Sequence, residues 1–290
     1  MKKIGLLLLL SPLLFIQSAI AEDIRIGVLA PRGELKAMQR WTEFGNYLGK
    51  QTGQSVKIVP LAPPKVIQAA KNKEVNFVLS HPPHTVALQE KFGAKPLATL
   101  NKKSGSQFAG VIIAKKGSGI TKASDLRGKK VMSLKFKVAA GAYIFQTYHL
   151  KQKGIDVHRD FASIKQGKKQ DDLVLAVNAG IIDAAFVRSG LLEAMQKEGK
   201  IKMSNFVIVD QRVDKNFKPV HTTELYPEWY LSSLKGNNPK LAKKVKAAAR
   251  KMGSDIDASK AAKINGFIEP LSLARMKAAL KSLKISPYDT

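Results

Sequence analysis

Residues 24–29 read IRIGVL and open the stretch of alternating strands and helices that decides the fold. The aliphatic run itself predicts a strand, and an apolar stripe at three- and four-residue spacing then predicts a helix. Residues 56–61 predict a second strand, Pro64 opens a second helix, and residues 76–79 predict a third strand. This order predicts a parallel sheet covered by helices on both faces. The helical stripe consists of Leu35, Met38, Trp41, Phe44 and Leu48, of which the last three are expected in the core.

A second α/β set follows in the chain. It comprises predicted strands at 108–114, 131–134, 184–187 and 206–209, and predicted helices at 139–152, 171–178 and 191–197. Further helices are expected after Asn238-Pro239 and over 273–283. Two α/β sets of this kind predict two lobes, with a ligand bound between the strand ends of one lobe and those of the other. Lobe 1 is expected from residues 22–107 and 213–290 and lobe 2 from 108–212, with crossings near 105–111 and 210–220. One continuous sheet remains the alternative.

The first 21 residues are typical of a cleavable secretory signal peptide. Lys2 and Lys3 precede an apolar run, and Ala19-Ile20-Ala21 form a small-residue cleavage site before Glu22. A retained membrane anchor is the competing interpretation, but the apolar run is shorter than the roughly 20 residues that span a bilayer. The chain has no cysteine, so neither a disulfide nor a lipoprotein anchor is available, and the periplasm is the expected location.

The chain is strongly basic, with a formal charge of +27. The excess is densest over residues 101–170, where 16 Lys or Arg face three Asp. Such a field concentrates small anions near the protein, although most individual lysines are expected to solvate the surface. Nucleic acid is excluded as a partner, because no RNP or helix-turn-helix pattern accompanies the charge and the chain is expected to be exported. Binding to an anionic envelope surface remains an alternative use of the charge.

Three segments resemble one protein family: NFVLSHPPH at 76–84, DAAFVRSGLLE at 183–193 and HTTELYPEW at 221–229. The family is the phosphate/phosphite/phosphonate type of periplasmic solute-binding protein, and the branch most similar is that of tetrathionate-type sensor kinase periplasmic domains. The resemblance extends over nearly all of the mature chain. It implies an α/β, two-lobed type II periplasmic binding protein fold with a ligand cleft between the lobes. It also implies that the lobes close over a small oxyanion.

The resemblance also implies which residues hold the anion. Main-chain N–H groups at strand-to-helix turns and the positive end of a helix dipole suit an anion, and an arginine can add a bidentate contact. Thr85 stands where phosphonate binders tend to have Tyr, and Ala139-Ala140-Gly141 replaces a Ser-Thr-Ser, which argues against phosphonate as the ligand. A His-Asp pair of the family falls on Gln170-Asp171. The implied ligand-binding residues are Ser80, His84, Thr85, Ala140, Gly141, Gln170, Asp171 and Arg188.

Several of these residues also have a purely structural interpretation. Arg188 could pair with Glu193 on the surface, and Asp171 could cap a helix. Tyr226 and Trp229 are expected to pack at a lobe boundary. His81 and His84 could share a metal ion, but two ligands are too few, so no metal and no cofactor is predicted. His149 and His158 are expected to be ordinary surface or half-buried residues.

Catalytic patterns are missing from the sequence. It contains no Gly-x-Ser-x-Gly elbow, no Walker loop, no His-Glu-x-x-His and no cysteine nucleophile, so no enzymatic activity is predicted; a Ser/His/Asp set assembled only in space stays open. We expect a monomeric periplasmic protein that captures a phosphate-like, phosphonate-like or sulfur-type oxyanion. Its expected partner is an ABC permease or a separate membrane sensor kinase. The alternative is a basic envelope-surface-binding protein without a small-molecule ligand.

Overall fold

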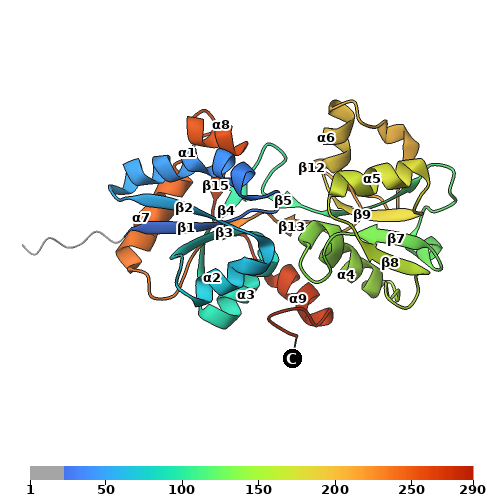
Figure 1. Ribbon diagram of the computed structural model, residues 1–290, viewed down its shortest axis with the longest axis horizontal. Helices are drawn as coiled ribbons and strands as arrows, with labels where there is room; N and C mark the ends of the chain where they lie inside the picture. The colour runs from blue at the N-terminus through green and yellow to red at the C-terminus, as the bar shows by residue number, and fades with distance from the viewer. Residues whose placement is uncertain (1–22, 290) are drawn as a thin grey trace, which may run out of the picture.

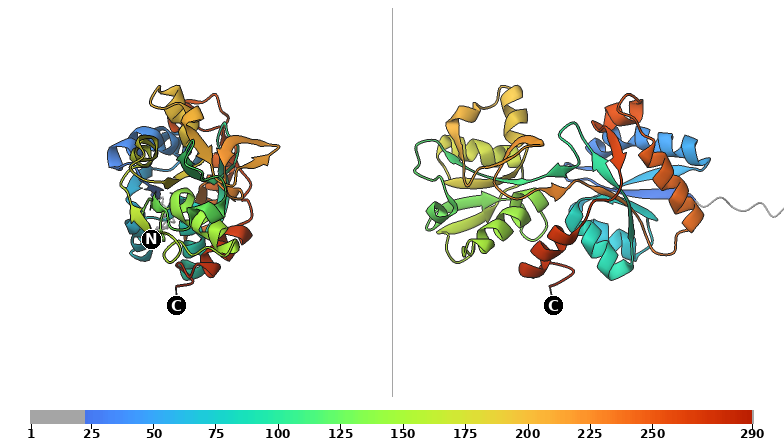
Figure 2. Two further views of the ribbon diagram at one scale, coloured as in Figure 1. Left: turned by 90° about the vertical axis from the view of Figure 1, so that its right-hand side faces the viewer. Right: turned by 180° about the vertical axis from the view of Figure 1, so that it is seen from behind.

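The computed structural model describes residues 23–289, which form two α/β lobes joined by extended segments (Figures 1 and 2). Each lobe has its own central sheet with helices on both faces. The predicted signal peptide, residues 1–21, lies outside the described residues. No helix between residues 23 and 289 combines the length and the hydropathy that a bilayer-spanning segment requires.

The secondary structure alternates as the sequence predicts over most of the chain. The strands are β1 (Ile24–Leu29), β2 (Val56–Leu61), β3 (Phe77–Ser80), β4 (Lys95–Asn101), β5 (Gln107–Phe108), β6 (Gly110–Lys115), β7 (Lys130–Ser133), β8 (Ser163–Gln166), β9 (Ala184–Arg188), β10 (Phe206–Ile208), β11 (Arg212–Asp214), β12 (Phe217–His221), β13 (Tyr226–Pro227), β14 (Tyr230–Ser233) and β15 (Gly266–Ile268). The helices are α1 (Glu34–Thr52), α2 (Val66–Lys71), α3 (Pro82–Phe92), α4 (Phe145–Gln152), α5 (Gln170–Ala179), α6 (Leu191–Lys197), α7 (Pro239–Arg250), α8 (Asp257–Ala262) and α9 (Ala274–Ser282). Short helical turns are η1 (Pro63–Lys65), η2 (Ala123–Leu126), η3 (Ala140–Ile144) and η4 (Met203–Asn205).

The sheet of lobe 1 has the strand order β15-β4-β14-β3-β1-β2. Strands β2, β1 and β3 are parallel, as predicted, but β14 pairs antiparallel to both β3 and β4 and makes the sheet mixed. One face packs against α1, α7 and α8, and the other against α2 and α3. Trp41, Phe44 and Leu48 are fully buried in the first of these cores, which confirms their predicted role.

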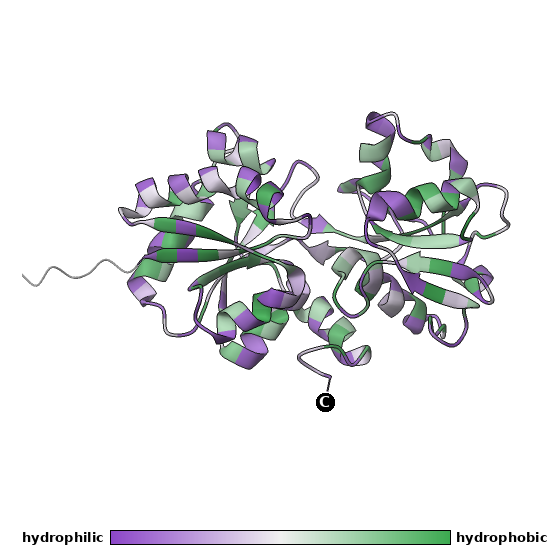
Figure 3. Ribbon diagram, in the orientation of Figure 1, coloured by the Kyte–Doolittle hydropathy of each residue, from purple (hydrophilic) through white to green (hydrophobic). Residues whose placement is uncertain are grey.

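The sheet of lobe 2 has the order β10-β6-β9-β7-β8. Alternate residues of β6 enter opposite cores: Ile112 packs with α4, and Ile113 with α5 and α6. This period of two is what a strand buried on both faces requires. Hydrophobic residues accordingly follow the strands and the inner faces of the helices in both lobes (Figure 3).

Two extended segments connect the lobes. The first crossing contains β5 and lies within the expected range of 105–111. The second contains β13, which pairs antiparallel with β5, and it lies later than the expected range of 210–220. The cause is the β11–β12 hairpin, which stays on lobe 2: Val220 N–H donates to Glu193 Oε1 (2.8 Å), and Thr222 N–H donates to the Gly110 carbonyl (3.0 Å). The predicted lobe limits, 22–107 with 213–290 and 108–212, stay a prediction.

An apolar cluster also bridges the lobes, on the side where α9 lies between α3 and α4 (Figures 1 and 2). The ring of Phe145 from α4 stacks on the ring of Tyr226 from β13, with centroids 3.8 Å apart. Met276 and Leu280 of α9 are fully buried in the same cluster, together with Val86 of α3. Tyr226 therefore packs at a lobe boundary, as predicted.

Gly266 at the start of β15 offers a test of the packing at the sheet edge. Its φ is +107°, and a Cβ there would lie 2.2 Å from the Met252 carbonyl oxygen, whereas Gly236, at φ +97°, has no atom within 4 Å of such a Cβ. We expect Gly236→Ala to lower the free energy of unfolding by about 1–2 kcal/mol through backbone strain alone. Gly266→Ala should cost roughly 1–3 kcal/mol more, because of the added clash. Urea denaturation of both variants measures the difference, and equal losses would contradict the described position of β15.

Candidate functional site

The sheet topology brings polar residues of lobe 1 to one edge. Strands β1, β3 and β4 run in the same direction and β14 runs against them, so the ends of the first three and the start of the fourth coincide. We call this the lobe-1 edge. It contains Arg32 after β1, Ser80 at the end of β3, Lys102 after β4 and Glu228 before β14.

A second edge belongs to lobe 2 and faces the first across the crossing segments. Strand β9 ends at Arg188 opposite Gly110, where antiparallel β6 begins. Strand β7, parallel to β9, ends at the same edge, and η3 follows it. We call this the lobe-2 edge. It contains Ala140, Gly141, Gln170 and Arg188, so all the lobe-2 residues predicted for the site, apart from Asp171, meet there.

The turn from β3 into α3 offers no main-chain donor over residues 82–85. Pro82 and Pro83 lack an N–H, His84 N–H donates to Nδ1 of the N-cap residue His81 (3.4 Å), and Thr85 N–H donates to the His81 carbonyl (3.1 Å). The Thr85 hydroxyl donates to the same carbonyl, so it is turned toward its own helix. By contrast, Ser80 Oγ and His84 Nδ1 are buried and have no partner among the described residues. The polar groups that this turn can offer to a ligand therefore belong to side chains.

The two histidines of this turn are stacked and uncharged at neutral pH. Their ring centroids lie 4.1 Å apart, and both side chains are buried. Desolvation lowers the pKa of His81 to about 4, and desolvation together with the neighbouring His81 holds the pKa of His84 well below its usual value. Within the part of the chain that the structure describes, no group of three His, Cys, Asp or Glu side chains could hold a metal ion, so the pair has no third ligand there.

The turn from β7 into α4 presents main-chain donors instead. The N–H groups of Ala140, Gly141 and Ala142 have no hydrogen-bond partner within residues 23–289, as expected for the first residues of a helix. Gly141 lies against the lobe-2 edge, because a Cβ there would stand 3.0 Å from the Phe108 ring and 3.3 Å from Arg188 Cβ. The missing side chain allows this close approach.

A buried amide fixes this turn to the sheet. Gln146 Nε2 lies within hydrogen-bond distance of three carbonyl oxygens, those of Gly141 (2.9 Å), Val187 (2.9 Å) and Val111 (3.2 Å). It thereby holds η3, the end of β9 and the start of β6 in one arrangement. Sequence reasoning missed Gln146, since a single glutamine in a helix carries no motif.

Arg188 has no carboxylate at ion-pair distance among the described residues, so the predicted surface pair with Glu193 is absent. Its N–H donates to Gln170 Oε1 (2.8 Å), which ties the start of α5 to the end of β9. Its Nη1 donates to the Ser189 carbonyl (3.1 Å), and the side chain stays exposed. Asp171 is the second residue of α5 rather than its cap, and it pairs with Lys200 at 3.5 Å.

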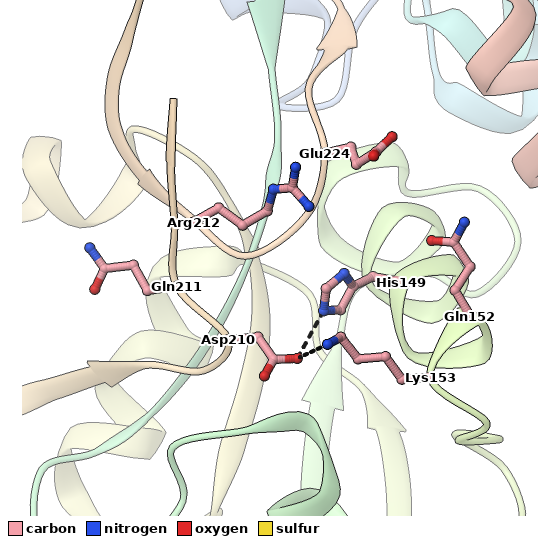
Figure 4. Close-up of a pocket in the computed structure, with 7 residues that line it drawn as sticks. All are labelled: His149, Gln152, Lys153, Asp210, Gln211, Arg212 and Glu224. Carbon is pink, nitrogen blue, oxygen red and sulfur yellow. Dashed lines mark hydrogen bonds and ion pairs between the residues drawn. The ribbon is translucent and has the colours of Figure 1, made fainter. Parts of the chain in front are cut away.

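Two cavities lie elsewhere, and none of the predicted site residues lines either of them. The first, of about 360 Å³, is formed by α4, the segment after β10 and Glu224 (Figure 4). In it Asp210 accepts from His149 Nε2 (3.0 Å) and pairs with Lys153 (3.4 Å), so His149 is a buried, bonded residue rather than the surface or half-buried one expected. The second, of about 450 Å³, lies beside the start of α9.

Comparison with known proteins agrees with this two-lobed architecture. A family model described as ABC transporter, phosphonate, periplasmic substrate-binding protein matches residues 26–274. The tetrathionate sensor histidine kinase TtrS of Salmonella typhimurium is 29% identical over 280 residues, which are 94% of this chain and 46% of the kinase. The chain thus spans less than half the length of this curated relative.

Solved structures share the fold. XAC2383 from Xanthomonas citri, bound to ATP, has a TM-score of 0.74 at 17% identity, covering 90% of this chain and 98% of that one. PhnD1 from Prochlorococcus marinus, in complex with methylphosphonate, has a TM-score of 0.67 at 15% identity, with the same coverage of both chains.

The depressed pKa of His81 predicts acid sensitivity. The unfolded chain takes up a proton on His81 near pH 6.5, but the folded protein does so only near pH 4. The contribution of His81 to stability is therefore full above pH 6.5 and should fall below it by roughly 1.4 kcal/mol per pH unit until about pH 4, in addition to the loss that His84 causes. His81→Asn keeps an N-cap acceptor without a titrating ring, so in urea denaturation at several pH values it should reduce the slope and leave the part that His84 causes. His81→Ala should reduce it too, with a constant loss of about 1 kcal/mol from the missing cap. An unchanged slope in His81→Asn would refute the assignment.

Proposed function

The chain belongs to the family of periplasmic phosphonate-type substrate-binding proteins of ABC transporters, and on that premise we propose that it captures a small oxyanion between its lobes. The family resemblance and the two-lobed α/β fold predicted from the sequence are both confirmed. Members of this family act in the periplasm, and the family and its solved relatives are binding proteins rather than enzymes.

The observation that carries the proposal is the row of N–H groups at Ala140, Gly141 and Ala142 beside Arg188, none of which has a hydrogen-bond partner in the described part of the chain. Main-chain donors at a helix start favour the same kind of ligand as an arginine without a carboxylate partner. That ligand is an anion with several acceptor oxygens. Ser80 Oγ and His84 Nδ1, which are buried and have no partner among residues 23–289, add polar contacts from lobe 1. An anion touching both edges stabilises the closed form, because only that form satisfies both.

The proposed ligand-binding residues remain those expected from the sequence, but we expect them to differ in their importance for binding. Ala140, Gly141, Gln170 and Arg188 form the principal set, and Ser80 and His84 face them from lobe 1. Thr85 and Asp171 act indirectly, since Thr85 bonds to its own helix and Asp171 pairs with Lys200. The anion is phosphate-like, phosphonate-like or a sulfur oxyanion, and the lack of hydroxyls in the lobe-2 turn disfavours phosphonate.

The protein is proposed to act as a monomer and to deliver its bound state to a membrane partner. The family works with ABC permeases, and a relative is a sensor kinase, so either a permease or a separate sensor kinase fits. The tagged mature protein can be used to capture its partner from membranes. Identification of that partner as a permease or as a kinase separates the two alternatives.

A thermal-shift and calorimetry screen tests the proposed function. The mature protein is titrated with phosphate, phosphite, methylphosphonate, sulfate, thiosulfate, tetrathionate, selenate and arsenate. We expect saturable stabilisation by at least one anion at moderate salt. Arg188→Ala should weaken that anion roughly 10- to 100-fold through loss of charge-assisted hydrogen bonds, whereas Lys165→Ala, an exposed lysine of the same lobe, should not. Binding to anionic vesicles alone, without any anion response, would favour the envelope-surface alternative.

Ala140→Pro tests the main-chain contact by itself. Position 140 begins η3, and Ala139 before it has φ −74° and ψ 107°, values that suit the residue preceding a proline. The substitution therefore removes one N–H donor at little cost to folding. We expect about tenfold weaker anion binding. Asp257→Pro, at the first position of α8 far from the edges, is the matched control. Undiminished affinity in Ala140→Pro would exclude that N–H as a contact.

A further inference from the structure

Helix α7 presents one stripe of lysines to solvent. The stripe begins at Lys240, and its other members stand three, four and eleven residues further on, so all of them lie on one face of the helix. The last of them follows the helix and keeps helical backbone angles. All are exposed, whereas the apolar face of the same helix is buried in the core of lobe 1. We call Lys240, Lys243, Lys244 and Lys251 the α7 lysine stripe.

The fold does not neutralise this stripe. Helix α7 contains no Asp or Glu, and within residues 23–289 none of the stripe lysines lies at ion-pair distance from a carboxylate. By contrast, Lys246 and Arg250, on the neighbouring face of α7, both pair with Glu269. The positive charge of the stripe is therefore uncompensated over the part of the chain that the structure describes.

The stripe also lowers the stability of its own helix. Lys240 is the second residue of α7, where the helix macrodipole is positive and a carboxylate is the favoured charge. Lys240 and Lys244 stand four residues apart, a spacing at which like charges repel and at which a glutamate before a lysine stabilises a surface helix instead. A local arrangement that costs stability without a gain inside the fold indicates a functional site. The missing counter-charge is expected from outside the chain.

The stripe lies far from the two sheet edges. Strand β14 starts at the lobe-1 edge and leads away from it, and α7 begins after the turn that follows, so this helix lies toward the end of lobe 1 that is remote from lobe 2 (Figures 1 and 2). The turn adds one more exposed lysine, Lys235. A partner bound to the stripe therefore leaves the space between the lobes open to a small ligand.

We propose that the α7 lysine stripe binds the protein to a membrane surface that carries anionic phospholipid headgroups. Members of this family act in the periplasm, where bilayer surfaces are within reach. From Lys240 to Lys251 the stripe measures about 16 Å along the helix axis, so all its ammonium groups can lie within one Debye length, about 8 Å, of a flat surface at once. Each such lysine strengthens attachment about fivefold. Because the apolar face of α7 stays in the core, the attachment is electrostatic and reversible.

Sedimentation with lipid vesicles tests the stripe. We expect the mature protein to bind vesicles of equimolar phosphatidylglycerol and phosphatidylcholine, to ignore phosphatidylcholine alone, and to dissociate at high salt. Lys240→Glu/Lys244→Glu should weaken binding at least about 25-fold. The control Lys116→Glu/Lys165→Glu changes the net charge equally at exposed positions of lobe 2 and should weaken it less than about fivefold. Equal losses in the two double variants, or no binding by the unaltered protein, would overturn the proposal.

Two single variants separate membrane binding from folding. Lys240→Glu should weaken vesicle binding but raise the urea midpoint, because it places a carboxylate at the positive end of α7 and four residues before Lys244. Ala247 is exposed within the stripe, so Ala247→Lys should strengthen vesicle binding about fivefold, whereas Ala162→Lys, an exposed site of lobe 2, should not. Structural damage cannot raise the midpoint and weaken binding together. A lower midpoint in Lys240→Glu, or equal effects of the two added lysines, would refute the role of the stripe.

The same variants distinguish the membrane from other polyanions and from the ligand of the cleft. Binding to soluble dextran sulfate without binding to phosphatidylglycerol vesicles would identify an acidic polymer as the occupant and overturn the proposal. Calorimetry with the small anions of the earlier screen should give the same affinities for Lys240→Glu/Lys244→Glu as for the unaltered protein. The membrane proposal and the proposed function can therefore fail independently of each other.

Discussion

The pairing of β5 with β13 is the constraint on which the rest of the structure depends. These two short strands place Tyr226 opposite Phe108 and Pro227 opposite Gln107, and they carry the chain between the lobes in both directions. Strand β13 leads into Glu228, whose carboxylate pairs with Lys102 after β4, and β5 leads into β6, whose first residue Gly110 lies opposite Arg188 at the end of β9. Backbone hydrogen bonding at the crossing thus joins the segments next to both sheet edges.

The two edges use different chemistry. At the turn into α3, Pro82 and Pro83 have no N–H, and the N–H of His84 is bonded to the ring of His81. This turn therefore offers the side chains of Ser80 and His84. The turn into η3 lacks hydroxyl side chains but keeps its N–H groups free, beside Gly141 and Arg188. One edge therefore presents neutral groups that desolvate easily, and the other presents directed donors with a full charge.

The sequence predicted those parts of the fold that depend on local pattern. The elements between Ile24 and Leu79 follow from periods of two and 3.6, and α6 begins and ends as predicted. Strands β4 and β14 were missed, because β14 has only four residues and owes its place to pairing with strands far away in sequence. Helix α3 was not among the elements predicted from the local pattern, although Pro82 and Pro83 stand at its first positions, where proline is favoured. At the site, the motif residues near Arg188 were predicted, but Lys102 and Glu228 meet across a separation of 126 residues that no local pattern reveals.

The position of α9 limits the direction in which the two lobes can move apart. Its buried face joins α3 of one lobe and α4 of the other in a single apolar cluster, and Lys151 of α4 donates to the Ser282 carbonyl at its end. Parting the lobes on that side would bring Met276, Leu280 and Phe145 into water, at about 25 cal/mol for each Å² of apolar surface. Rotation about this seam avoids that penalty. The α9 side is therefore the side on which apolar burial keeps the two lobes in contact.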